Sequence, residues 1–291
     1  MDTVLDALVI GLFEAAPLVL AAMGFTLIYY LNGFINVAYA ENLTMGAYFA
    51  IFFNTTLGLN FYVAIAPAAI MAGLLSVLTF LVVFQPAIRR GVGRIELIVM
   101  SVGVSFFIRH AARVVFGVTN KVFDFSDTSF FRVFGIGITS AQLTALVLVA
   151  VIAIALYRFI YKTDYGERMR ALASNENLAL VSGINPTRVS VLIWFFAGVA
   201  GGLAGIFFGV FSFVNYLLGW NLILIIIMIT IIGGIGSVRG AMVAGIGAGI
   251  VTAAAVLTLP VTLYSQVLLL VLFILVLKVR GMRGSVFGAR A

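Results

Sequence analysis

Residues 162–188 read KTDYGERMRALASNENLALVSGINPTR and form a polar interruption in a chain that is otherwise apolar. Apolar runs flank this stretch on both sides, at 141–160 and at 189–214. A helix needs about 20 predominantly apolar residues to cross a membrane, and each run is long enough. The polar stretch therefore joins two predicted membrane spans and lies outside the bilayer.

The composition of the whole chain agrees with this interpretation. Hydrophobic residues make up 64% of the 291 residues and charged residues only 9%, whereas soluble domains have about 45–50% and about 25%. This excludes a soluble fold and predicts an all-α, polytopic integral membrane protein with a single transmembrane domain over 1–291. The long unbroken apolar runs argue against an outer-membrane barrel, and the absence of cysteine excludes disulfides and thiolate metal sites.

Further apolar runs predict the remaining spans. They lie at 4–30, 61–84, 95–116, 222–235, 241–257 and 261–277. The stretch 31–55 differs, because Asn32, Asn36 and Glu41 precede an apolar half that is too short to cross comfortably. We expect a broken helix or half-helix there, and about eight or nine transmembrane helices in total.

Lysine and arginine set the predicted orientation. Most of them lie in the loops 86–94 and 162–188, in the turn at 237–240 and in the tail after 277. Because cytoplasmic loops carry an excess of these residues, this side is predicted to be cytoplasmic. The N-terminus then lies outside if the stretch 31–53 crosses the membrane, and inside if that stretch re-enters.

The polar stretch itself shows helix-capping signals. Asp164-x-x-Glu167 matches a capping box that would start one short helix. Ser174 or Asn175 would cap a second short helix that ends at Gly183. An ordered, charged loop of this kind predicts a docking surface for a partner; the alternative is an ordered loop without a partner.

The loop also resembles a known family. The segment YGERMRALASNENLALVSGIN (165–185) is similar to the cytoplasmic coupling loop of the branched-chain amino acid type, LivH-like, permeases of ABC importers. The blocks 24–48, 195–209 and 231–245 also resemble family segments, in family order over almost the whole chain. The chain departs from the family pattern at Tyr39 and Ala40, where the family has His and Gly before the Glu. This departure leaves the substrate open.

The resemblance implies a multi-pass permease subunit in the inner (plasma) membrane of a prokaryote. It would translocate branched-chain or other amino acids, or else urea or short amides. The implied partners are a second homologous permease, two cytoplasmic ABC ATPase subunits and an extracytoplasmic solute-binding protein that delivers the solute. This chain would hold no cofactor, since ATP and Mg would be bound by the ATPase subunits, and it contains no GxxxxGK[ST] phosphate loop. The residues expected to contact an ATPase are Glu167, Arg168, Arg170, Ala171 and Asn175.

Three polar residues are predicted to lie at membrane depth, namely Glu14, Asn36 and Glu41. An unpaired polar group there costs several kcal/mol, so such groups are paired or line a cavity. One interpretation is that they form or gate the translocation path. The other is that they make interhelical hydrogen bonds that hold the bundle together.

Closely spaced glycines in 189–214 predict tight helix crossing, either within the chain or against the second permease. These are Gly198, Gly201, Gly202, Gly205 and Gly209. Arg109, His110 and Arg113 are expected to anchor a helix end at the outer interface. The alternative is that they meet an acidic rim of the solute-binding protein. The lone histidine offers no metal site.

Two other classes of function fit this sequence less well. An autonomous channel or a secondary transporter would leave the capped polar loop unexplained, and the spans show no paired Asp or charged relay. A membrane-embedded enzyme would need a motif such as HExxH or GxSxG, which is absent. We therefore predict no catalytic residue and no enzymatic activity in this chain.

Overall fold

The structure is a computed structural model that describes residues 2–124, 130–133, 136–234, 236–258 and 263–282. Most described residues are helical. The helices are α1 (Asp2–Asn32), α2 (Tyr39–Ile51), α3 (Phe61–Thr79), α4 (Gln85–Arg89), α5 (Arg94–Phe116), α6 (Ser140–Lys162), α7 (Asp164–Ser174), α8 (Glu176–Val181), α9 (Pro186–Phe211), α10 (Leu218–Gly233), α11 (Val238–Thr258) and α12 (Leu263–Met282).

Short irregular elements complete the fold. The π-helical turn η1 (Phe52–Thr56) continues α2. A second π-helical turn, η2 (Phe80–Phe84), joins α3 to α4. Two strands, β1 (Phe130–Val133) and β2 (Ile136–Thr139), pair antiparallel with Phe130 opposite Thr139. This hairpin was not predicted from the sequence, and it leaves the predicted all-α class intact.

The helices are those of a polytopic membrane protein. Among the described residues, six helices are long and apolar enough to cross a membrane. Two shorter apolar helices lie at Leu218–Gly233 and Val267–Val276. The predicted fold class is therefore confirmed, and each apolar run of the sequence corresponds to a helix.

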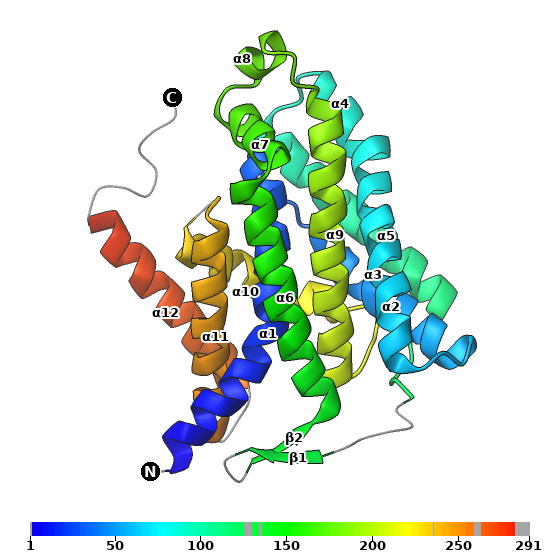
Figure 1. Cartoon of the computed structure of the whole chain (residues 1–291), viewed down its shortest axis with the longest axis vertical. Helices are drawn as coiled ribbons and strands as arrows, with labels where there is room; N and C mark the ends of the chain where they lie inside the picture. Colours follow the sequence, from blue (N-terminus) through cyan, green and yellow to red (C-terminus); the bar gives the residue numbers. More distant parts are fainter. Residues whose placement is uncertain (1, 125–129, 134–135, 235, 259–262, 283–291) are drawn as a thin grey trace.

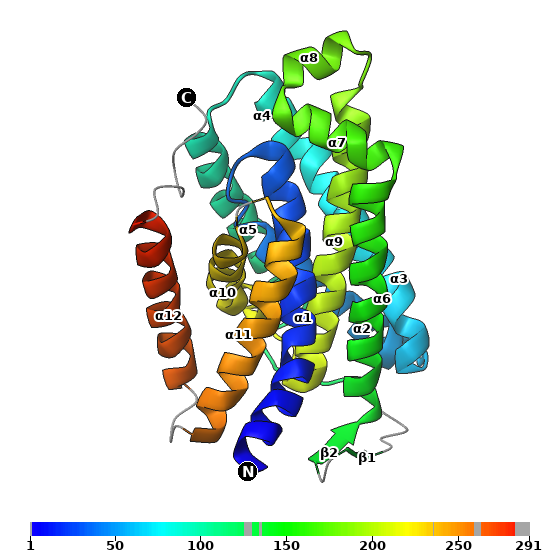
Figure 2. The same cartoon turned by 60° about the vertical axis from the view of Figure 1, so that its left-hand side comes forward.

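The two ends of the molecule differ clearly. Helices α4, α7 and α8 lie at one end, and the β1–β2 hairpin and the N-terminus lie at the other (Figures 1 and 2). The chain crosses between α1 and α3 by a non-helical segment, 33–38, followed by the half-helix α2. This geometry corresponds to the crossing alternative, in which the N-terminus and the α7–α8 loop lie at opposite ends.

Close packing around α9 organises the core. Helix α9 packs against α1, α2 and α3, and its glycines let the backbones approach. A Cβ atom on Gly205 would collide with the carbonyl oxygen of Leu43 in α2, and one on Gly46 would collide with the backbone of Gly202. Of the other predicted packing glycines, Gly198 lies against Ala72 and Ser76, Gly201 against Tyr39, and Gly209 against Val214 and Phe123.

Helices α1 and α11 form a second close pair. Gly11 lies against the backbone of Ile250, and Gly249 lies against Ala15. Since α1 runs away from the hairpin end, α11 runs back toward it (Figure 1). The same small-residue packing therefore recurs on both sides of the bundle.

Candidate functional site: a broken helix and a projecting loop

The break between α1 and α2 lies inside the helix bundle. Helix α1 ends at Asn32, whose side-chain oxygen accepts a hydrogen bond of 2.9 Å from the indole N–H of Trp194. Gly33 has φ of +70°, a left-handed conformation that glycine adopts without strain. The backbone N–H of Val37 then donates to the hydroxyl of Ser101 on α5, at 3.0 Å. Helix α5 thus satisfies a backbone group that the break leaves without a helical partner.

A buried ion pair follows directly after the break. One carboxylate oxygen of Glu41, on α2, accepts hydrogen bonds from Nη2 and Nε of Arg109 on α5, at 2.8 and 3.1 Å. The Ser105 hydroxyl donates to the same oxygen at 2.7 Å. The side chains of Arg109 and Glu41 are only 5% and 1% exposed. The guanidinium therefore neutralises a carboxylate that would be very costly alone at this depth.

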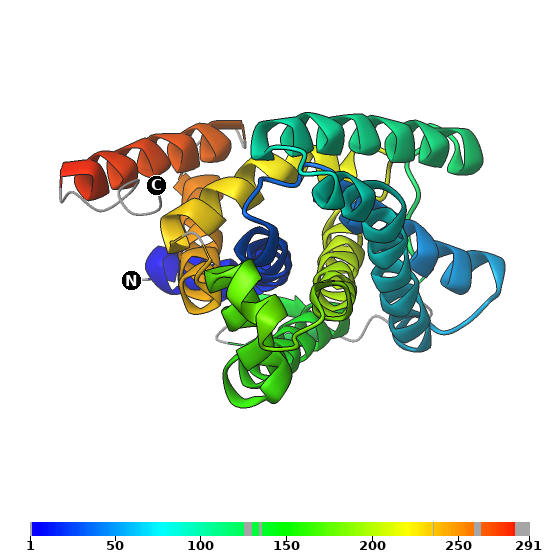
Figure 3. The ribbon, with the colours of Figure 1, turned by 90° about the horizontal axis from the view of Figure 1, so that it is seen from above.

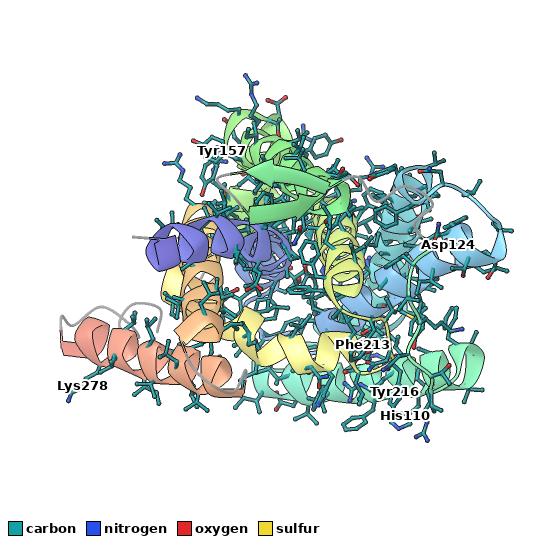
Figure 4. All side chains as sticks on the ribbon, turned by 90° about the horizontal axis from the view of Figure 1, so that it is seen from below. His110, Asp124, Tyr157, Phe213, Tyr216 and Lys278 are labelled. Carbon is teal, nitrogen blue, oxygen red and sulfur yellow. The ribbon has the colours of Figure 1, made fainter. Side chains whose placement is uncertain are left out.

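Aromatic rings enclose the guanidinium of Arg109. Its central carbon lies 4.0 Å from the centre of the Trp220 ring on α10 and 5.2 Å from that of Phe106. Figure 4 shows Tyr216, from the segment before α10, on the same side of the molecule as His110 of α5. Arg109 thus contacts two short helices: α2 through the carboxylate of Glu41, and α10 through the ring face of Trp220.

Arg109 is not the interfacial anchor that the sequence suggested. We predicted that it would reach the membrane surface with His110 and Arg113, and only these two are exposed. Arg109 turns inward because Glu41 offers it a paired site in the core. Ser101, Ser105 and Arg109 recur every four residues, which places them on one face of α5. That polar stripe within an apolar helix is the signal that could have revealed the site.

The remaining polar residues of the break have different surroundings. The Asn36 side chain is 2% exposed, and neither its oxygen nor its nitrogen has a hydrogen-bond partner among the described residues. Tyr39 is fully buried against Gly24 and Gly201. Glu14 lies half-buried on α1, with no hydrogen bond to another described residue. Asn36 and Glu41 are thus close in sequence and both buried, whereas Glu14 lies well before them on α1.

The α7–α8 loop is a pair of capped helices, as predicted. The cap of α7 differs in detail, because the hydroxyl of Thr163 accepts from the backbone N–H of Gly166 while Asp164 lies in the first turn. Asn175 caps α8 by accepting from the N–H of Leu178 at 3.0 Å. Gly183, with φ of +79°, ends the loop. Thr163 was missed because the sequence offers a competing acidic residue immediately after it.

The predicted ATPase-contact residues divide into two groups. Glu167, Arg168 and Ala171 are exposed on α7. Arg170 is half-buried, and its guanidinium donates to the carbonyl oxygen of Ile160, which ties α7 to the end of α6. Asn175 is exposed, although its side-chain oxygen is used in the cap. The loop thus presents one group outward and uses the other to hold its own shape.

Helix α8 presents apolar side chains at the end of the molecule. Leu178 is 65% exposed and Val181 is 87% exposed, and α8 projects beyond the ends of the long helices (Figures 1 and 2). Apolar groups grouped on a projecting helix, beside the charges of α7, are typical of a protein contact surface.

A polar cavity of about 930 Å³ connects this end of the molecule with the break. Asn32 and Gly33 line it at the end of α1, and Gln85 and Arg89 line it from α4. Thr187 at the start of α9 accepts hydrogen bonds from both Gln85 and Arg89, at 2.8 and 3.1 Å. The cavity therefore lies between residues of the α7–α8 loop, such as Glu176, and the end of α1.

Comparison with known proteins identifies the family of this chain. The family model described as branched-chain amino acid transport system / permease component matches residues 7–277. The chain belongs to this family. It is a permease component and a multi-pass protein of the plasma membrane.

Relatives of full length have modest sequence identity. A probable branched-chain amino acid transport permease LivH of Methanocaldococcus jannaschii is 29% identical over 80% of this chain and 75% of its own. BraD, a high-affinity branched-chain amino acid transport permease of Pseudomonas aeruginosa, is 26% identical over 86% and 85%. LivH of Escherichia coli is 27% identical over 92% and 91%. No solved structure was found to match.

Proposed function

We propose that this chain is a permease subunit of an ATP-driven importer of branched-chain amino acids. Relatives that this chain matches over most of their length are named as permeases of branched-chain amino acid transport. The proposed partners are a second homologous permease, two ABC ATPase subunits and a solute-binding protein. ATP and Mg would be bound by the ATPase subunits, and solute would pass through the membrane domain.

The observation that carries this proposal is the projecting α7–α8 loop. Its exposed surface combines Glu167 and Arg168 of α7 with Leu178 and Val181 of α8. Apolar and charged side chains together favour binding to a protein over free solvation. The bond from Arg170 to Ile160 links this surface to a membrane helix, so that a force applied to α7 is transmitted to α6.

The proposed translocation path runs beside the break. Non-helical backbone at membrane depth is tolerated where protein surrounds it or where it lines a cavity. Broken helices are also how many transporters form solute sites. The proposed path residues are therefore Asn36 and Glu41. Among the described residues, the side-chain oxygen and nitrogen of Asn36 and the second carboxylate oxygen of Glu41 have no hydrogen-bond partner. Glu14 is a weaker candidate because it lies on α1, away from the break.

Docking can be tested by substitution on the loop. We expect Arg168→Glu and Val181→Asp to reduce co-purification of the ATPase subunits and to reduce solute uptake, because each places an acidic group in the proposed contact. Matched controls at the opposite end are Arg113→Glu and Val118→Asp, both at exposed positions, and they should leave co-purification of the ATPase subunits unchanged. Unchanged complex formation and uptake in both loop variants would contradict docking at α7–α8.

The substrate is tested by uptake into proteoliposomes that contain the assembled transporter and its binding protein. We expect accumulation of labelled leucine that unlabelled isoleucine and valine suppress and that acidic amino acids and urea do not. Suppression by urea alone would replace amino acids with a small amide as the substrate. Uptake without ATP would contradict the importer and favour a channel or secondary transporter.

A further inference from the structure

The segment before α2 has a counterpart before α10. Residues 34–43 read FINVAYAENL and residues 213–222 read FVNYLLGWNL, so that Phe, Asn, Asn and Leu recur at the same positions. Each stretch follows the end of a long helix, α1 or α9, and leads into a shorter helix after a non-helical segment of equal length, 33–38 or 212–217. The two breaks are therefore similar in both sequence and local structure.

The neighbouring helices obey the same correspondence. If α1, α2 and α3 correspond to α9, α10 and α11, then α1 packing on α11 is equivalent to α9 packing on α3, and both pairs are in contact. The correspondence extends to α5 and α12, because α2 packs on α5 and α10 packs on α12. Helices α5 and α12 also lie along the same side of the bundle (Figures 3 and 4). Because α1 and α9 run in opposite directions (Figure 1), the repeat is inverted.

The two half-helices meet at their N-terminal ends. The backbone N–H of Gly219, in α10, donates to the hydroxyl of Thr44 in α2 at 3.0 Å. A Cβ atom on Gly219 would collide with the carbonyl oxygen of Ala40. In the repeat, Gly219 corresponds to Ala40. The equivalent residues of the two copies thus contact each other at the meeting point.

Arg109 is held between another equivalent pair. Glu41 and Trp220 occupy the same position in the two copies, one residue after Ala40 and Gly219. The guanidinium of Arg109 is ion-paired with Glu41 at 2.8 Å and lies over the ring of Trp220 at 4.0 Å. A single cation from α5 therefore binds both half-helices at corresponding positions.

We propose that Arg109 is a positioning residue that clamps α2 and α10 into one gate, and that it couples movement of this gate to the ATPase cycle. The proposal rests on the proposed importer function. Two half-helices that meet end to end separate only if contacts between them break. A clamp that is charged on one side and aromatic on the other can release α10 while it keeps the buried carboxylate of Glu41 paired. Arg109 itself does not need to touch the solute.

The test uses the complete transporter and measures solute uptake per ATP hydrolysed together with ATP hydrolysis in the absence of solute. The paired variant Glu41→Gln/Arg109→Gln removes the clamp without leaving a buried charge unpaired. Trp220→Leu removes only the ring contact, and Trp220→Phe retains an aromatic face. We expect the paired variant and Trp220→Leu to lower uptake per ATP at least about fivefold and to raise hydrolysis without solute, since coupling energies of 1–3 kcal/mol are typical.

The matched control is Phe107→Leu, which removes an aromatic ring from an exposed position of α5 and should behave as wild type. Recovery of coupling in Trp220→Phe, with Trp220→Leu defective, supports the clamp even if the paired variant does not assemble. Wild-type coupling in both Trp220 variants overturns the clamp. If the wild-type complex imports no amino acid, the proposed function fails instead. Hydrolysis then decides the clamp, which is supported if the variants raise it and overturned if they leave it unchanged.

Discussion

Glycine residues, whose side chain is a single hydrogen atom, set how closely the helices approach in this protein. Gly205 of α9 lies against the carbonyl oxygen of Leu43 in α2, where a methyl group has no space and no flexible neighbour could move away. Gly103 of α5, by contrast, has no atom of another residue near its missing side chain. The two glycines therefore have different physical roles although both lie in the interior of a helix.

We expect Gly205→Ala to destabilise the protein by about 1–3 kcal/mol, because overpacking forces the backbones of α9 and α2 apart. Gly103→Ala should be neutral or stabilising by up to about 1 kcal/mol, since alanine has the higher helix propensity. The thermal unfolding midpoint of the purified transporter measures both. Equal midpoints for the two variants would contradict the packing role of Gly205.

The spacing of glycines along one helix is visible in the sequence, whereas the pairing of polar groups between helices is not. The closely spaced glycines of 189–214 already predict tight helix crossing. Arg109, in contrast, stands beside His110 and Arg113 near the end of an apolar run, so that local sequence favours an interfacial position. Its partner Glu41 is 68 residues away. No periodicity within one helix reveals which polar groups of two helices will meet.

At the scale of elements, the break between α1 and α2 depends on a neighbour for its shape. Residues 33–38 form no helix of their own, and the hydroxyl of Ser101 accepts from the N–H of Val37. Loss of this acceptor would leave the N–H of Val37 without its hydrogen-bond partner in a half-buried environment, which costs free energy.

We expect Ser101→Ala to lower the free energy of unfolding by about 1–3 kcal/mol and to speed amide hydrogen exchange at Val37. Thr252→Val on α11 is the control, because the Thr252 hydroxyl donates to the carbonyl oxygen of Ala248 in its own helix. Hydrogen-exchange mass spectrometry and thermal unfolding report the two effects. Unchanged exchange over residues 33–38 in Ser101→Ala would show that the break needs no support from α5.

The sequence predicted these elements well where signals are local. Asn32, Asn36 and Glu41 interrupt an apolar run, and the structure has a break followed by the half-helix α2. The N-cap at Asn175 was likewise predicted. The counterpart half-helix α10 was treated as an ordinary span, because an unbroken apolar run does not show where a helix begins relative to the bilayer.

For the whole molecule, the two ends are predicted to lie on opposite sides of the membrane. The α7–α8 end holds Arg89, Arg168 and Arg188, and the hairpin end holds the N-terminus (Figure 1). The positive-inside rule predicts that the first end is cytoplasmic. Since the chain has no cysteine, a single introduced thiol reports the side of the membrane without background.

We expect a membrane-impermeant maleimide to label Thr119→Cys in right-side-out membrane vesicles and to leave Asn177→Cys unlabelled until the vesicles are permeabilised. Both positions are exposed, Thr119 after α5 and Asn177 on α8. Electrophoretic mobility after labelling gives the measurement. The reverse pattern would invert the orientation and would remove the α7–α8 loop from the reach of a cytoplasmic ATPase.

The exposed apolar tip of α8 also bears on how the subunit is made. Val181 and Leu178 project from the membrane domain into water when no partner covers them. If the chain is synthesised in excess of the proposed ATPase partner, it displays this tip to chaperones and proteases, which recognise exposed apolar segments. Balanced synthesis of the subunits would therefore protect this protein from degradation before any solute is transported.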